Sequence, residues 1–216
     1  MQTLTEVIIA AGLRERILSE SQLARLLGGS AQRRYNLVNR ALHHGELIRL
    51  RRGCYRLATA ISGTAPHPFV VAQALRPGSY VSLESALSVR GLIPEAVPST
   101  LSIVPGRRRD DMTVPEHGSF LFRPLALNRG YFLEGVERLV LDGQAALVAC
   151  PWRALLDRCA LFKADWRGLS DLLNSLRIDP DDLSAFHADE LDALKPVYRH
   201  QRLRTLIDAL QRELTP

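Results

Sequence analysis

Polar residues at helical spacing between positions 30 and 44 offer the clearest candidate chemistry in this sequence. On a helical wheel drawn at about 100° per residue, six of them fall on one arc: Gln32, Arg33, Asn36, Asn39, Arg40 and His43. Arginine can form paired hydrogen bonds with guanine, and asparagine or glutamine with adenine, so this arc can read base edges in a major groove. None of the six is acidic, which favours DNA recognition over the alternative of a solvated helix face.

The helix that carries this arc is predicted at positions 31–43. Ser30 precedes it as an N-cap and Gly45 follows it as a helix-ending residue, and Ser30 is counted among the expected DNA contacts. Four apolar residues lie on the other side, and we expect them to face the neighbouring helices: Ala31, Tyr35, Val38 and Leu42.

Two shorter helices are predicted before this one. Positions 3–11 form a helical pattern that Gly12 ends. Ser19 and Gln22 form a capping box at the start of the second helix, which ends at positions 28–29 in two glycines. Three helices in this order, with a tight glycine-containing turn before the third, are typical of a helix-turn-helix.

A hairpin is predicted directly after the third helix, in the run GELIRLRRGCYRLA at positions 45–58. Apolar residues supply two short strands, and Gly53 suits a turn that needs a positive φ. Arg51 and Arg52 lie at the tip, where they can contact a phosphate backbone or reach a minor groove. We therefore interpret positions 1–60 as a winged helix-turn-helix domain that binds double-stranded DNA.

The distribution of charge agrees with that interpretation. The first 60 residues contain ten arginines and four glutamates, a net charge of +6 in a chain whose total is +5. The remaining 18 basic and 19 acidic residues leave the rest of the chain nearly neutral. A basic patch on a small domain attracts a polyanion through the release of counterions.

Composition limits the other classes of protein. A length of 216 residues with 46% hydrophobic residues predicts two folded domains. We expect a cytoplasmic protein without a membrane partner, because no apolar run reaches the roughly 18 residues of a membrane helix and the start does not resemble a signal peptide. The three cysteines lack metal-type spacing, and we expect them to be small buried side chains in a reducing compartment.

The second part of the chain reads as a mixed α/β domain. A linker is predicted at positions 61–68 and the domain at 69–216, with a helical part from about 151. Four strands are expected, at positions 100–104, 119–123, 136–141 and 145–150. Helices are expected at positions 69–75, 83–90, 151 onward, 166–176, 180–186 and 196–214. The fold class is therefore predicted as α+β.

A search for catalytic groups gives no candidate. Ser82 and Ser85 do not lie in a nucleophile elbow, and helix capping explains Ser82 better. The histidines lack ligand spacing, and no phosphate-binding loop occurs. We expect no catalytic residue, no metal and no cofactor. An enzyme that acts on nucleic acid is an alternative class of function, in addition to the two classes of DNA-binding protein given below. The basic run Arg107–Arg109 and an acidic strip at positions 179–192 are each either solvated surface or a contact for a partner.

Three segments, taken in order, resemble AbiEi-type antitoxins. They are RRGCYRLA at positions 51–58, GSYVSLESAL…GLIP at 78–94, and ACPWRALLDRC at 149–159. The last is similar to a family pattern A-T-P-E-[RK]-A-L-L-D, with Cys150 and Trp152 in place of its Thr and Glu. The resemblance runs from the N-terminal domain to about Asp157.

The resemblance implies an antitoxin of a type IV toxin–antitoxin pair, of the kind linked to phage defence. Its winged helix would bind operator DNA, as a monomer or a dimer, and repress its own operon. Its C-terminal domain would counter a nucleotidyltransferase-like toxin without the need for a stable complex. The alternative is a winged-helix transcriptional regulator without a toxin partner, whose second domain senses a ligand or dimerises.

Overall fold

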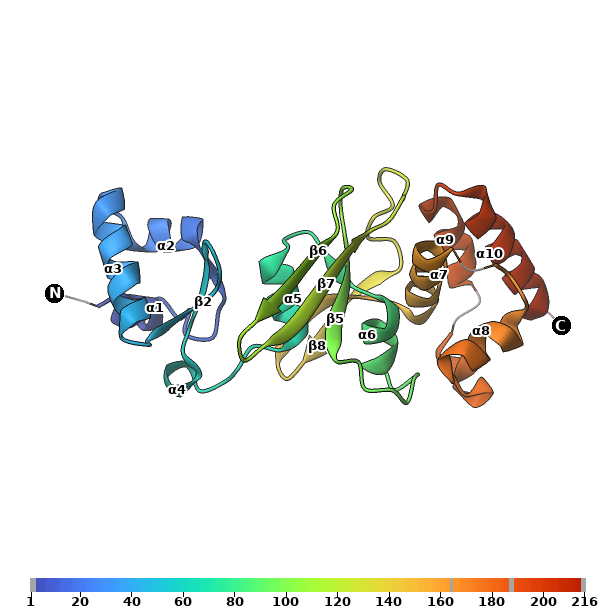
Figure 1. Cartoon of the computed structure of the whole chain (residues 1–216), viewed down its shortest axis with the longest axis horizontal. Coiled ribbons are helices and arrows are strands. Elements are labelled where there is room, and N and C mark those ends of the chain that lie inside the picture. The colour runs from blue at the N-terminus through green and yellow to red at the C-terminus, as the bar shows by residue number, and fades with distance from the viewer. Residues whose placement is uncertain (1–2, 164, 187–188, 215–216) are drawn as a thin grey trace. The chain divides into compact units, whose positions relative to one another are not determined.

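The computed structural model describes residues 3–163, 165–186 and 189–214, without the side chains of residues 183–185 (Figure 1). Contacts divide the chain into two compact units. Unit 1 comprises residues 1–77 and 114–117, and unit 2 comprises residues 78–113 and 118–216. The domain limits predicted at positions 60 and 68 therefore fall inside unit 1. None of the described helices has the length and apolar character of a membrane span.

Unit 1 begins with three helices, α1 (Leu4–Ala10), α2 (Glu20–Leu27) and α3 (Ala31–His43). Each has a hydroxyl side chain at its N-cap that accepts a hydrogen bond from the backbone N–H three residues on. The capping box predicted for Ser19 and Gln22 is confirmed. The predicted helix at 31–43 has the bounds of α3.

A three-stranded antiparallel sheet completes this part of unit 1. Strands β2 (Leu47–Arg51) and β3 (Cys54–Leu57) form the predicted hairpin, and Gly53 in its turn has a φ of +75°. A two-residue strand that the sequence pattern did not predict, β1 (Leu18–Ser19), pairs with β3, so the strand order is β1-β3-β2. The helices and the sheet share one apolar core: Leu4, Ile8, Leu18, Leu23, Ala41, Leu47, Tyr55 and Leu57.

The segment predicted as a linker is partly helical. Helix α4 (Thr59–Ser62) precedes it and overlaps its start, and α5 (Pro68–Leu75) begins at its end. The apolar side of α5 is buried, including Val71 and Ala72.

Unit 2 contains a six-stranded mixed sheet in the order β6-β7-β5-β4-β9-β8. Its strands are β4 (Tyr80–Val81), β5 (Ser99–Val104), β6 (Asp110–Val114), β7 (Gly118–Pro124), β8 (Val136–Leu141) and β9 (Gln144–Ala149). β5 runs parallel to β7 and β4 runs parallel to β9, whereas the β4–β5 and β8–β9 pairs are antiparallel. The four predicted strands correspond to β5, β7, β8 and β9. The sequence did not predict β6, because its residues DDMTV are too polar for a strand pattern.

The remaining helices belong to unit 2. They are α6 (Leu83–Ser88), α7 (Pro151–Phe162), α8 (Leu169–Leu176), α9 (Glu190–Leu194) and α10 (Gln201–Leu214), with 3-10 turns η1 (Pro180–Ala185) and η2 (Lys195–Val197). The first of them, α6, lies beside the sheet, whereas α7, α8, α9 and α10 lie together in the C-terminal part of the unit (Figure 1). The prediction placed the starts of α8 and α10 too early. Gly168 has a φ of +105° and Tyr198 is extended, so neither can continue a helix. The α+β class and a largely helical C-terminal part are thus correct.

A buried ion pair lies at the centre of unit 2. The Arg153 Nε atom donates to Asp157 Oδ1 at 2.9 Å within α7, and both side chains are fully buried. The same carboxylate accepts hydrogen bonds of 2.8 Å from the hydroxyls of Tyr80, Ser82 and Tyr198. We call these five residues the Asp157 cluster. It joins β4, α7 and the segment before α10.

The remaining polar groups of the cluster are also satisfied. Arg153 Nη1 donates to the carbonyl of Glu134 at 2.7 Å, and Nη2 donates to the Tyr80 hydroxyl at 2.6 Å. The guanidinium lies over the rings of Tyr80 and Tyr198. Burial and the negative charge of Asp157 raise the pKa of both tyrosines well above the ordinary value. Their hydroxyls therefore stay protonated and act as donors.

We predict that Asp157→Asn lowers the free energy of unfolding of the full chain by about 3–5 kcal/mol, because Arg153 would keep its buried charge without a partner. The amide would also present a donor where the carboxylate accepts four hydrogen bonds. Urea unfolding followed by circular dichroism measures the change. The matched control is Asp111→Asn, which removes an exposed carboxylate paired with Arg123 and should change stability little. Equal effects of the two substitutions would contradict a central role for the cluster.

Candidate nucleic-acid interface

The predicted polar arc of α3 is largely exposed. Among its residues Gln32, Arg33, Asn36, Arg40 and His43 are exposed, and Asn39 is partly buried. The Gln32 amide donates to the Asn36 side-chain oxygen at 3.0 Å, so these two side chains lie together on the helix surface. Ser30 is exposed as well, but its hydroxyl accepts from the Arg33 backbone N–H at 3.3 Å and caps the helix. The arc therefore presents amide and guanidinium groups to solvent.

The apolar side of α3 differs from the prediction. Tyr35 was expected to face the core, yet 63% of its surface is exposed, and Ala31 is exposed as well. Val38 and Leu42 pack against the core as predicted, and they are joined there by Leu37 and Ala41, which the prediction did not include. The helix is therefore rotated so that the smaller residue Ala41 meets the core, and the tyrosine ring lies outside it.

The turn between α2 and α3 fixes where α3 begins. Gly28 and Gly29 both have positive φ, a conformation that favours glycine. The guanidinium of Arg34 donates to the carbonyl of Gly29, and its Nη1 lies 3.5 Å from the carbonyl of Gly28. These carbonyls follow the end of α2, where no helical partner is available. Arg34 therefore holds the turn through its hydrogen bonds to these carbonyls.

The tip of the hairpin is tied to the start of α2. The backbone N–H of Glu20 donates to the carbonyl of Gly53 at 2.9 Å. A Cβ atom added to Gly53 would come within 3.3 Å of the Glu20 carboxylate, in addition to the strain of its positive φ. Arg51 and Arg52 beside it are exposed, and Arg51 Nη1 donates to the Arg52 carbonyl at 3.1 Å. Both predicted tip arginines thus lie at the surface.

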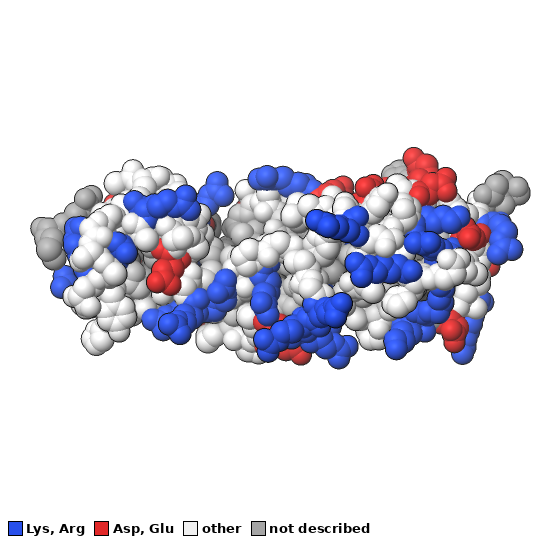
Figure 2. Space-filling model, turned by 90° about the horizontal axis from the view of Figure 1, so that it is seen from above, with Lys and Arg blue, Asp and Glu red and all other residues white. Residues whose placement is uncertain are grey.

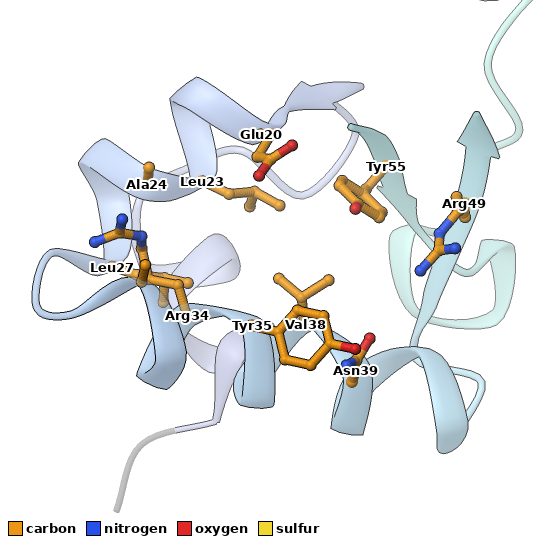
Figure 3. A pocket seen from close by; sticks show the side chains of 11 residues that line it. Glu20, Leu23, Ala24, Leu27, Arg34, Tyr35, Val38, Asn39, Arg49 and Tyr55 are labelled. Carbon is orange, nitrogen blue, oxygen red and sulfur yellow. The ribbon is translucent and has the colours of Figure 1, made fainter. Parts of the chain in front are cut away.

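A groove lies between α2, α3 and the hairpin, and its side chains point toward a shared open space (Figure 3). Its apolar lining comes from α2 and α3: Leu23, Ala24, Leu27, Ala31 and Val38. Its polar and aromatic lining comes from all three elements: Glu20, Arg34, Tyr35, Asn39, Arg49 and Tyr55. The Arg49 guanidinium lies 5.9 Å from the centre of the Tyr55 ring. We call this feature the α2–α3 groove.

Among the polar and aromatic residues that line this groove, sequence reasoning had identified only Asn39 as a site residue. Arg49 is exposed on β2, and a charged residue between the apolar residues Ile48 and Leu50 is the sequence signal that would have found it. Tyr35 was assigned to the wrong side of α3. Glu20 was counted only as part of the total charge, although it brings a carboxylate to the groove. That carboxylate opposes the approach of phosphate.

The charge of the N-terminal arginines is only partly available at the surface. Arg56 is buried, donating to the Thr59 hydroxyl at 3.0 Å and to His117 Nε2 at 3.0 Å. Burial and the neighbouring Arg56 charge lower the pKa of His117, which therefore accepts this bond as a neutral ring. Elsewhere, Lys and Arg side chains are spread over the face seen in Figure 2, with fewer Asp and Glu side chains among them.

Other candidate groups do not assemble into a second site. Among the described residues, no three His, Cys, Asp or Glu side chains are placed to hold a metal ion. Ser82 was predicted to cap α6, but its hydroxyl makes no capping bond and belongs to the Asp157 cluster. Arg107–Arg109 form an exposed turn between β5 and β6. In the acidic strip, the Asp179 carboxylate accepts from the Asp181 N–H and the Asp192 carboxylate accepts from Gln211, so part of the strip serves local structure.

Comparison with known proteins adds no family assignment. A scan of protein-family models gave no match to the chain, and a search of curated proteins gave no significant match.

We predict that the thiols of the folded protein react slowly at pH 8. Cys54, Cys150 and Cys159 are all free and buried. Burial raises the pKa of all three, that of Cys150 to about 12 and that of Cys159 to about 11, and the thiolate is the reactive form. Alkylation with iodoacetamide followed by mass spectrometry should label none of them within minutes, and all three after denaturation in urea. Rapid labelling of one cysteine in the folded chain would show that its environment is open.

Proposed function

We propose that this protein binds double-stranded DNA through unit 1, acting as a winged helix-turn-helix in which α3 enters the major groove and the hairpin contacts the phosphate backbone. The observation that carries the proposal is the exposed arc of α3, which offers base-reading side chains and no acidic one. The exposed arginines of the hairpin tip add a phosphate contact next to it. Helices α1–α3 followed by β2–β3 are the element order that such a domain requires.

The division of labour between the two surfaces follows from their chemistry. Amide and guanidinium groups on α3 can distinguish bases, because each base pair presents its own donor and acceptor pattern in the major groove. On the proposed function Arg51 and Arg52 contact the phosphate backbone, whose charge is the same for every sequence. Substitutions on the two surfaces should therefore have different consequences.

The resemblance to AbiEi-type antitoxins supports a more specific role. On that basis the protein represses its own operon and counters a nucleotidyltransferase-like toxin through unit 2. It acts without catalysis, cofactor or metal.

We predict that substitutions on α3 reduce the preference for one DNA sequence, whereas substitutions at the hairpin tip weaken binding to all sequences. Asn36→Ala should weaken binding to a preferred duplex by about 1–3 kcal/mol and leave binding to random DNA nearly unchanged, because it removes a base contact. Arg51→Ala and Arg52→Ala should weaken binding to both, and each should reduce the slope of log K against log salt by about one unit. Fluorescence anisotropy between about 50 and 200 mM salt measures both effects.

The matched control for the arginines is Arg212→Ala, which removes an exposed arginine from α10 in unit 2. It should leave both the affinity and the salt slope unchanged. Thermal unfolding of each variant separates lost binding from lost folding. If Asn36→Ala and Arg52→Ala reduce binding to preferred and random DNA by the same factor, the assigned roles are wrong.

A second prediction concerns the proposed antitoxin activity. Co-expression of the full chain with the open reading frame beside its gene should restore growth that the neighbour alone inhibits. The double variant Arg51→Ala, Arg52→Ala should still restore growth from an unrelated promoter, because the proposal assigns toxin neutralisation to unit 2. A neighbour that does not inhibit growth, or inhibition that the chain does not relieve, would favour a transcriptional regulator without a toxin partner.

A further inference from the structure

Tyr35 occupies an unusual position for an aromatic residue in unit 1. With 63% of its surface exposed, it is one of two large apolar residues of this unit, among those described, that are exposed, and Ile9 is the other. Helical spacing places Gln32 and Asn39 beside it on the polar arc and Ala31 and Val38 beside it on the groove side. The ring therefore stands between the row of hydrogen-bonding side chains and the apolar lining of the α2–α3 groove (Figure 3).

The groove behind the ring is small. Its volume is about 150 Å³, and Leu23, Leu27 and Val38 contribute to its lining. A space of that size accommodates a methyl group or one aromatic ring, but not a folded segment of another protein. A small group carried by a larger molecule fits this space, and the leucine and valine side chains of the lining favour an apolar group there.

The charges around the groove identify the class of that molecule. Arg49 points toward the open space from β2, and the exposed tip arginines of the same hairpin follow in sequence. Glu20 is the one acidic residue in the lining, and it lies at the start of α2. A polyanion that carries small apolar groups fits this surface better than a neutral ligand does. In the major groove of DNA, the apolar group is the 5-methyl of thymine.

We propose that Tyr35, at the mouth of the α2–α3 groove, reads the 5-methyl group of a thymine in the bound DNA. This inference rests on the proposed function and deepens it, because it names a base and the residue that recognises it. The phenol ring covers the methyl group on one side, and the hydroxyl of Tyr35 is not required. Removal of one methyl group from an apolar contact should weaken binding about fourfold.

The test begins with selection of a preferred duplex from random DNA by the full-length protein. Each thymine of that duplex is then replaced, one at a time, by deoxyuridine, which lacks only the methyl group. For the wild-type protein, at least one replacement within the selected site should weaken binding about fourfold. Tyr35→Ala should bind the thymine and deoxyuridine duplexes equally, whereas Tyr35→Phe should retain the wild-type preference. Tyr131→Ala removes an exposed tyrosine from unit 2 and serves as the matched control, which should keep the preference.

The outcomes separate this inference from the proposed function. A protein that selects no DNA sequence would overturn both. A protein that selects a sequence but tolerates deoxyuridine at every thymine would overturn only the role of Tyr35. The role is also wrong if Tyr35→Ala keeps the wild-type preference for thymine, or if Tyr35→Phe loses it, because the hydroxyl would then be the reading group. Circular dichroism of each variant shows whether α3 is still formed.

Discussion

The carboxylate of Asp157 is the group on which unit 2 depends most. It is fully buried and accepts hydrogen bonds from one arginine and three hydroxyls, which come from parts of the chain as far apart as β4 and Tyr198. A buried charge is tolerated only when its partners are all in place, so the cluster specifies one packing of these segments. Two of the three resembling segments, GSYVSLESAL and ACPWRALLDRC, supply four of the five cluster residues. These two segments therefore help to determine the packing of unit 2.

Unit 1 obtains its geometry from backbone groups rather than from a buried charge pair. Arg34 holds the glycine turn before α3, and the hydrogen bond from Glu20 N–H to Gly53 ties α2 to the hairpin tip. These contacts set α3 and the hairpin on the two sides of one groove. The surface proposed to bind DNA is thus positioned by residues that need not contact DNA themselves.

Local rules of sequence predicted much of this structure. The caps at Ser19 and Ser30, the bounds of α3 and the positive φ of Gly53 were predicted because each depends on residues within a few positions. Features that depend on tertiary contacts were not. Periodicity alone could not decide which side of α3 meets the core, so Tyr35 was assigned inward. Ser82 was expected to cap a helix, because its true partner, Asp157, lies 75 residues away. Strand β1 is too short to have a period, and its pairing with β3 is visible only in the fold.

On the proposed function, the positions of the N-terminal arginines determine which of them can contribute to the affinity for DNA. Counting by sequence gives ten arginines in the first 60 residues. Of these, Arg56 is buried and Arg34 is bonded to backbone carbonyls, while Arg14 donates to the carbonyl of Ile61 at 2.6 Å. Glu20 further reduces the positive potential inside the groove. Hydrogen bonds to neutral carbonyls leave the positive charges of Arg14 and Arg34 in place, so of these three only the buried Arg56 is withdrawn from the surface. Sequence-independent binding scales with the number of phosphates that such charges neutralise. On the proposed function these charges supply an attraction that is the same for every DNA sequence, and the exposed amide and guanidinium groups of α3 supply the contacts that distinguish one sequence from another.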